Sequence, residues 1–226
     1  MEPILFCWSG GKDSAYALHT LRASGLYDVR ALLTTVTGEY NRISMHGVRV
    51  ELAEKQAAAV GIPLEKSIIH KGGSNDDYEK AMTDILLKYN AQGVKRVAFG
   101  DLFLEDIRSY REAQIAKVGM ECLFPLWGRN TKALAQSFIS DGFRTIITCV
   151  DTTLLDGSFA GREFDESFLA DLPDSVDPCG ENGEFHSFVF DGPLFDSLIA
   201  IEIGEKVLRD SRYMYCDVLG TRRGCL

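Results

Sequence analysis

The stretch ILFCWSGGKDS, residues 4–14, decides the fold because it joins a buried strand to a helix through a tight glycine turn. The apolar run 4–8 predicts a strand, and the spacing of Leu18 and Leu21 predicts a helix that follows at once. Two glycines let backbone N–H groups approach an anion closely, and the unpaired amides at the start of a helix add partial positive charge. Lys12 adds a mobile full charge. The pattern predicts a phosphate-binding loop.

This loop is not a Walker A motif, because the spacing G-x-x-x-x-G-K-[ST] is absent. We expect Lys12 to contribute to catalysis and little to packing, and Asp13 to orient the loop or to act with Mg²⁺. The alternative is a plain strand-to-helix turn with both side chains solvated. Agreement of the position, the flanks and all six loop residues favours a nucleotide site formed by Ser9, Gly10, Gly11, Lys12, Asp13 and Ser14.

The first half of the chain alternates short apolar runs with helical patterns. This alternation predicts βαβ units, and therefore an α/β fold with a mostly parallel, Rossmann-like sheet that binds ligands at the carboxyl ends of its strands. Glycines 25, 61, 93 and 119 fall where the helices should end. The predicted strands are 3–8, 29–36, 64–70 and 94–100, and the predicted helices are 14–23, 48–60, 76–92 and 107–117.

The pattern changes after PLWG at 125–128, so we predict two domains, 1–127 and 128–226, of which the first binds the nucleotide. The second is expected to be a smaller α+β unit that covers the nucleotide cleft. Its apolar segment 198–203 is a candidate for pairing across a homodimer. The predicted elements are a helix at 132–140 and strands at 145–150, 185–190, 197–203 and 213–218, with a long polar stretch at 151–184.

The fourth predicted strand ends at Gly100 and Asp101, on the same edge of the sheet as the loop. Asp101 is a candidate ligand for Mg²⁺ or ribose, and Arg108 and Arg111 on the next helix are candidates for phosphate oxygens. The alternative is that Asp101 caps this helix and both arginines pair with its glutamates. His46, in the loop after the second strand, is a candidate contact for substrate or base, or a helix cap.

Composition limits the partners of the chain. Its 226 residues are 46% hydrophobic, enough for a real core, and 33 acidic against 24 basic residues give a net charge of -9. That charge disfavours a nucleic-acid partner. No run approaches the roughly 20 apolar residues of a membrane span, and the apolar N-terminal run is too short for a signal peptide, so the cytoplasm is the predicted compartment. Six scattered cysteines without a C-x-x-C pair suggest neither zinc nor a disulfide framework.

Four segments carry a resemblance to a known family: SGGKDS at 9–14, GDL at 100–102, PLWGR at 125–129 and PCGENGEFHSFVFDGPLF at 178–195. The chain resembles, nearly end to end, the diphthine-ammonia ligases among the PP-loop ATP pyrophosphatases. Bacterial members are called adenine nucleotide alpha hydrolase-like, and the resemblance implies a HUP-type fold. It also implies that ATP and Mg²⁺ convert a carboxylate to an acyl adenylate with release of pyrophosphate, after which ammonia displaces AMP. Mg²⁺ would be held at Asp13 and Asp101.

The resemblance also implies an acceptor pocket around residues 179–186. The substrate of the eponymous enzyme carries a trimethylammonium group, which carboxylates and an aromatic ring can hold. The alternative is a polar hairpin with solvated glutamates. Asn182 stands where the family usually has a second glycine, and Ser187 where it often has threonine, which leaves the acceptor open. Free ammonia is the expected nitrogen source. The candidate acceptor residues are His46, Glu181, Glu184, Phe185 and His186.

Two other functions use the same loop. tRNA-modifying PP-loop enzymes need a basic surface and often a reactive cysteine, and the net charge of -9 and the isolated cysteines disfavour them. A nucleotide sensor would close its second domain over bound ATP without turnover. ATP that stays intact with Mg²⁺ and ammonia would favour the sensor.

Overall fold

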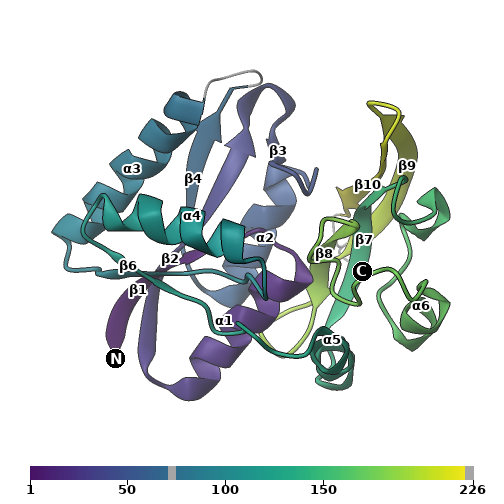
Figure 1. Cartoon of the computed structure of the whole chain (residues 1–226), viewed down its shortest axis with the longest axis horizontal. Helices are drawn as coiled ribbons and strands as arrows, with labels where there is room; N and C mark the ends of the chain where they lie inside the picture. The colour runs from purple at the N-terminus through teal and green to yellow at the C-terminus, as the bar shows by residue number, and fades with distance from the viewer. Residues whose placement is uncertain (71–74, 222–226) are drawn as a thin grey trace, which may run out of the picture.

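A computed structural model describes residues 1–70 and 75–221, and Figure 1 shows two sheets side by side. The first sheet and its helices occupy the N-terminal half. Their bounds lie within a few residues of the predicted ones, although the short strands β3 and β6 were not predicted. The elements are β1 (Glu2–Cys7), α1 (Lys12–Ser24), β2 (Tyr27–Thr37), β3 (Arg42–Ile43), α2 (Val50–Val60), β4 (Leu64–Ile69), α3 (Asn75–Ala91), β5 (Arg96–Ala98), α4 (Glu105–Ala116) and β6 (Glu121–Leu123).

The first sheet has the order β3-β2-β1-β5-β6, and β4 also pairs with β2. All of its strand pairs are parallel except β2 with β3, which confirms the predicted Rossmann-like sheet. The chain runs from β1 to β2 and β4 on one side and then crosses to β5 on the other. The strand order therefore reverses beside β1, which is where open α/β sheets bind ligands.

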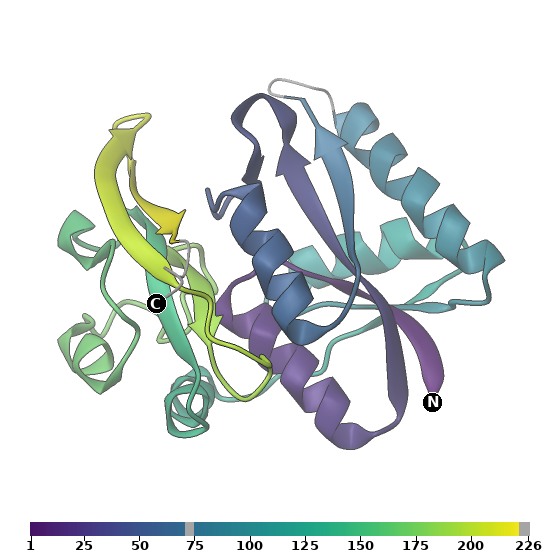
Figure 2. The ribbon, with the colours of Figure 1, turned by 180° about the vertical axis from the view of Figure 1, so that it is seen from behind.

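Helices cover both faces of this sheet. On one face α1 and α2 pack against Ile4 and Phe6, and on the other α3 and α4 pack against Leu5 and Leu33, as Figures 1 and 2 show. Alternate residues of β1 thus face opposite cores, because successive side chains of a strand point to opposite sides. The four predicted helix-stop glycines all have positive φ, so those predictions are confirmed.

The second sheet is antiparallel, with the order β8-β7-β10-β9. The α+β prediction is confirmed, but the strand predicted at 197–203 begins only at residue 201. The predicted polar stretch contains a helix, α6, with Phe159, Phe164 and Phe168 buried around it. The elements are α5 (Thr131–Ser140), β7 (Arg144–Asp151), η2 (Gly157–Phe159), α6 (Glu166–Asp171), β8 (Phe185–Asp191), β9 (Ile201–Arg209) and β10 (Tyr213–Gly220).

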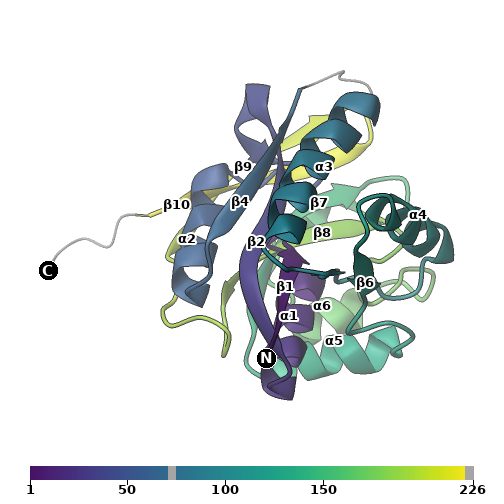
Figure 3. The same cartoon turned by 90° about the vertical axis from the view of Figure 1, so that its left-hand side faces the viewer.

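The two sheets share one hydrophobic core rather than a thin interface. Phe6 and Leu18 of the first half belong to the same buried cluster as Phe138, Phe164 and Phe185 of the second. Figure 3, turned by 90°, shows α5 and β8 beside α1. The two halves therefore pack together through buried apolar side chains.

Five cysteines of the described residues are free thiols, and Cys225 lies outside the described residues. Across residues 1–70 and 75–221, no helix is both long and apolar enough to cross a membrane.

Asp151, at the end of β7, determines part of the response to acid. Arg212 donates two hydrogen bonds to it, at 2.8 Å from Nε and 2.5 Å from Nη2, and this contact together with Thr153 lowers the pKa of Asp151 from 3.8 to about 2. A carboxylate with a lowered folded-state pKa stabilises the fold above pH 3.8, and that contribution is lost as the pH falls towards 2.

We therefore expect Asp151→Asn to reduce the pH dependence of the free energy of unfolding in this acid range. Urea unfolding of both proteins between about pH 5 and about pH 2 measures it. Parallel curves for the variant and the parent would show that Asp151 does not contribute.

Candidate active site

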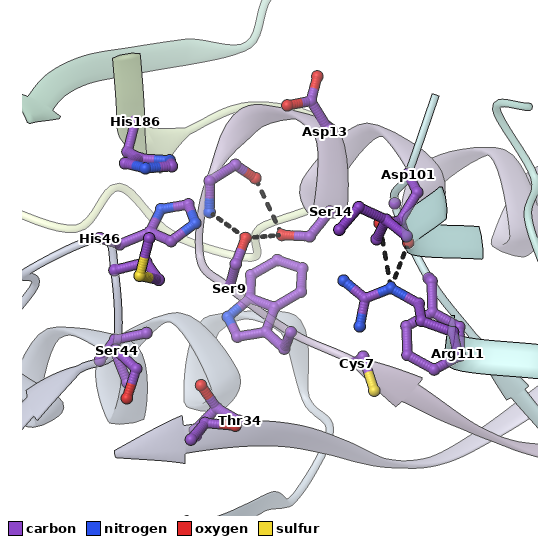
Figure 4. A pocket seen from close by; sticks show the side chains of 18 of the residues that line it. Cys7, Ser9, Asp13, Ser14, Thr34, Ser44, His46, Asp101, Arg111 and His186 are labelled. Carbon is purple, nitrogen blue, oxygen red and sulfur yellow. Dashed lines mark hydrogen bonds and ion pairs between the residues drawn. The ribbon is translucent and has the colours of Figure 1, made fainter. Parts of the chain in front are cut away.

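A cavity of about 960 Å³ opens at the carboxyl edge of the first sheet, and Figure 4 shows its inner part. It lies at the upper end of the usual size range of ligand pockets. Its wall comes from the glycine loop, the ends of β2 and β5, residues 43–46, the facing sides of α3 and α4, and residues 180–183 and 185–187 of the second half. Both halves of the chain thus build one site.

The glycine loop is held in shape by its two serines. Ser9 Oγ accepts a hydrogen bond from Gly11 N at 3.2 Å and donates to Ser14 Oγ at 3.1 Å, and Ser14 Oγ donates to Gly11 O at 3.0 Å. Gly10 has a φ of +77°, a conformation that glycine adopts without strain. The loop therefore presents the start of α1, with its partial positive charge, to the cavity.

Gly100 brings the end of β5 against this loop. A Cβ at Gly100 would lie 2.9 Å from the backbone N of Ser14, so only glycine permits the approach. The next residue, Asp101, lines the cavity and pairs with Arg111, whose Nε lies 2.9 Å from Oδ2. The guanidinium of Arg111 also stacks over the ring of Phe99 at 4.5 Å. The structure thus brings Gly100 and Asp101 to the phosphate loop.

The two candidate arginines of α4 point in different directions. Arg111 lines the cavity, whereas Arg108 does not, and Arg108 Nε instead donates to Glu112 at 2.8 Å on the outer side of the helix. Its guanidinium stacks on the ring of Trp127 at 4.7 Å. The arrangement matches the alternative in which a glutamate pairs with this arginine, and it makes Arg111 the arginine available to the site.

Lys12 is a fixed cation and not a mobile one. Its side chain is 4% exposed, its Nζ donates to Asp13 Oδ2 at 2.7 Å and to the carbonyl of Cys179, and it faces the Phe185 ring at 5.3 Å. Burial alone would lower the pKa of Lys12, but Asp13 and the other nearby acidic groups outweigh it, and the pKa is raised. The prediction that Lys12 contributes little to packing is wrong, because it joins the loop to the second half.

His46 and His186 form a buried pair beside the loop, with ring centroids 4.7 Å apart. His46 Nδ1 lies 3.2 Å from the carbonyl O of Ser187, and a Cβ at Gly11 would lie 2.9 Å from its Cε1. Burial lowers the pKa of His46 to about 4 and that of His186 to about 3, so both rings are neutral at pH 7. His46 therefore packs on the phosphate loop as part of the cavity wall.

Glu181 reaches across the cavity from the second half. Its Oε1 accepts a hydrogen bond from Leu102 N at 2.7 Å, and Phe103 N lies at 3.4 Å. Burial raises the pKa of Glu181 to about 7, although the Leu102 bond lowers it. A buried carboxyl group with such a pKa, in a cavity, is typical of functional sites.

Glu184 does not line the cavity. It is 3% exposed, and its Oε1 accepts hydrogen bonds from Asp177 N at 2.9 Å and from Asn182 Nδ2 at 3.0 Å. These hydrogen bonds stabilise the loop at residues 177–184. Phe185 lines the cavity, but its ring faces Lys12. Glu184 and Phe185 therefore do not form an open cage for a second cation.

Two supporting residues lie outside the predicted set. Ser187 Oγ accepts a hydrogen bond from Lys12 N at 3.1 Å, in place of a capping side chain within α1. Gln56 is fully buried on α2, and its Nε2 donates to the carbonyls of Gly10 at 2.9 Å and Val189 at 2.7 Å. Its position between Ala53 and Ala57 on the apolar face of a helix was a signal in the sequence.

The acidic residues near the loop do not form a complete metal site. Asp13 pairs with Lys12 and Asp101 with Arg111, and Figure 4 shows the two carboxylates pointing in different directions. Within the described ranges, no group of three His, Cys, Asp or Glu residues is placed to hold a metal ion. Carboxylates that supply one or two ligands, with phosphates supplying others, are the usual arrangement for Mg²⁺, so the donors present fit a nucleotide-bound ion.

Comparison with known proteins covers both halves of the chain. Residues 3–122 match the sequence model of the diphthamide synthase N-terminal domain, and residues 130–219 match that of the diphthamide synthase C-terminal domain. The chain is 28% identical to the diphthine–ammonia ligase of Danio rerio over 88% of this chain and 86% of the relative. The Bos taurus enzyme of that name is 29% identical, over 88% of this chain and 82% of the relative. The Homo sapiens enzyme is 27% identical, over 90% of this chain and 84% of the relative.

Proposed function

Because the chain belongs to the diphthamide synthase family, we propose that it is an ATP-dependent ligase that adenylates a substrate carboxylate and then amidates it with ammonia. The match over both halves favours this function over a nucleotide sensor and over a tRNA-modifying enzyme. The observation that carries the proposal is the glycine loop at the switch point of the sheet, which opens into a cavity shared with the second half.

In the first step a carboxylate oxygen attacks the α-phosphorus of ATP, and the bond from that phosphorus to the oxygen bridging to the β-phosphorus breaks. Pyrophosphate leaves with the developing negative charge. Loop amides and the ammonium of Lys12 would stabilise that charge, because fixed donors in a buried site need no reorganisation. We assign ATP binding to residues 9–14, Gly100 and Asp101. Arg111 takes the role that was expected of Arg108.

Asp13 and Asp101 would hold Mg²⁺ together with the nucleotide phosphates, and the ion would neutralise phosphate charge. In the second step the nitrogen of ammonia attacks the acyl carbon, the bond from that carbon to the phosphate oxygen of AMP breaks, AMP leaves, and the nitrogen loses a proton to water. A bare carboxylate has no usable leaving group at neutral pH, which is why adenylation must come first.

The acceptor is proposed to lie against the second half, on a wall formed by its Glu181, Phe185 and His186 together with His46 of the first half. This divides the chain into a nucleotide domain at 1–127 and an acceptor domain at 128–226. The acceptor is a carboxylate on a small molecule or on a modified protein residue. A homodimer would use the edge strand β9, which pairs only with β10 in the described part of the chain.

The proposal predicts that α-labelled ATP, Mg²⁺ and ammonium give labelled AMP and pyrophosphate when a pool of small carboxylates is present. Separation of AMP from ADP by chromatography measures the reaction, and omission of the pool is the control. Labelled ADP as the product would reject cleavage between the α- and β-phosphates. ATP that stays intact with every carboxylate offered would favour the sensor.

A further inference from the structure

Residues 44–47 form a tight turn in the wall of the cavity. Ser44, Met45 and His46 line it, and the turn is closed by hydrogen bonds from His46 N to Ser44 O at 2.8 Å and from Gly47 N to Ile43 O at 3.0 Å. His46 packs on Gly11 of the phosphate loop, as described above. The position of this turn therefore sets one side of the nucleotide site.

The backbone of this turn is strained. Met45 has a φ of +65°, a left-handed conformation that is unfavourable for a residue with a Cβ. Its side chain is 68% exposed, so burial of the side chain does not offset the cost. Strained residues persist only where the surrounding structure holds them. The contacts that hold the turn must therefore come from its neighbours.

Those contacts come from both sheets: Ser44 N donates to Thr35 O of β2 at 3.0 Å, and β10 of the second sheet holds the other end of the turn through Arg42 of β3. Arg42 Nη1 donates to the carbonyl of Gly47 at 2.6 Å and to Asp217 Oδ1 on β10 at 2.9 Å. The ring of Tyr215, also on β10, packs so closely that a Cβ at Gly47 would lie 2.8 Å from it. A carboxylate in the C-terminal half thus fixes, through one arginine, the turn that carries His46.

A second arginine binds the same carboxylate without holding the turn. Arg49 donates to Asp217 from Nη2 at 2.6 Å and from Nε at 3.2 Å, but it does not contact the Gly47 carbonyl. Both arginines are partly exposed, by 32% for Arg42 and 38% for Arg49. They therefore form a matched pair, in which removal of either leaves Asp217 with the other.

We propose that Arg42 and Asp217 are positioning residues that hold the 44–47 turn, and through it His46, against the phosphate loop. The effect on nucleotide affinity rests on the proposed ATP site. The line of contacts runs from Asp217 to Arg42, then to the Gly47 carbonyl, to His46 and to Gly11, although no atom of Arg42 or Asp217 belongs to the cavity wall.

Arg42→Met and Arg49→Met test this proposal with the full chain. Displacing a site wall by even a small distance is costly, so Arg42→Met should raise the Kd for α,β-methylene ATP at least about tenfold. Arg49→Met should change this Kd by no more than about twofold, and the two variants should have similar melting temperatures. Titration of each protein gives the Kd, and equal losses of affinity in both variants would overturn the proposal.

Hydrogen–deuterium exchange at the amides of His46 and Gly47 tests, without nucleotide, whether Arg42 and Asp217 hold the turn; we call this pair of contacts the clamp. Faster exchange in Arg42→Met than in Arg49→Met is the expected result, and equal exchange would overturn the clamp. If the parent protein fails to bind the analogue but this difference appears, the clamp stands and the ATP site fails. The two hypotheses are therefore rejected by different outcomes.

Discussion

Replacing Lys12 with methionine is expected to lower the rate of AMP formation by about 10²–10³-fold, the usual effect of removing one charge-stabilising donor from an active site. Methionine keeps most of the aliphatic stem but removes the cation that faces the loop, Asp13 and the Cys179 carbonyl. The measurement is the initial rate of AMP release from α-labelled ATP at saturating ATP, together with the Kd for the α,β-methylene analogue.

The buried position of Lys12 demands a control for stability. In Lys12→Met the Asp13 carboxylate loses its partner, which destabilises the protein as well as the reaction. The double variant Lys12→Met/Asp13→Asn removes both charges and should recover part of the lost free energy of unfolding. If activity recovers along with stability in the double variant, then Lys12 acts through the fold and not on the departing pyrophosphate.

Gln56→Leu is expected to lower the free energy of unfolding by about 2–6 kcal/mol, because it leaves two buried polar groups without partners at roughly 1–3 kcal/mol each. Trp8 Nε1 loses its acceptor at 3.0 Å and the Val189 carbonyl loses its donor, while the Gly10 carbonyl keeps its second donor, Val189 N. Leucine fits the apolar neighbours of α2, so the loss comes from hydrogen bonding. Urea denaturation measures it.

Gln136→Leu is the matched control for this change. Gln136 is exposed on α5, and the same substitution there should alter the free energy of unfolding by no more than about 0.5 kcal/mol. Nucleotide affinity should fall in Gln56→Leu as well, since the Gly10 carbonyl is part of the loop. A Gln56 variant as stable as the Gln136 variant would refute the role assigned to this amide.

The sequence was sufficient for the first sheet and its loop because the signals there are local. A strand, two glycines and a helix start within eleven residues leave few alternatives, and the glycines after the helices have the positive φ expected of them. The short strands β3 and β6 could not be predicted, because runs of two and three residues carry no periodicity. Segment 198–200 is apolar without being a strand, since hydrophobicity alone does not separate a packed loop from a strand.

The site was less predictable because it depends on which way side chains turn. Arg111 faces the cavity with Ile107 and Gln114, at helical spacings of three and four, while Arg108 lies on the other side of α4. That stripe could be read from the sequence. Burial of Glu184 could not, because its partners are a backbone amide and a neighbouring side chain within the same loop. Roles of the other acceptor residues stay predictions.

The hydrogen bond from Val189 N on β8 to the Gly10 carbonyl, at 2.9 Å, means that the phosphate loop is completed by a strand encoded more than half the chain away. A recombination event that exchanged the C-terminal half for an unrelated domain would remove part of the loop itself. Lineages with this architecture should therefore acquire new acceptors by point substitutions within the existing half, and rarely by exchange of domains.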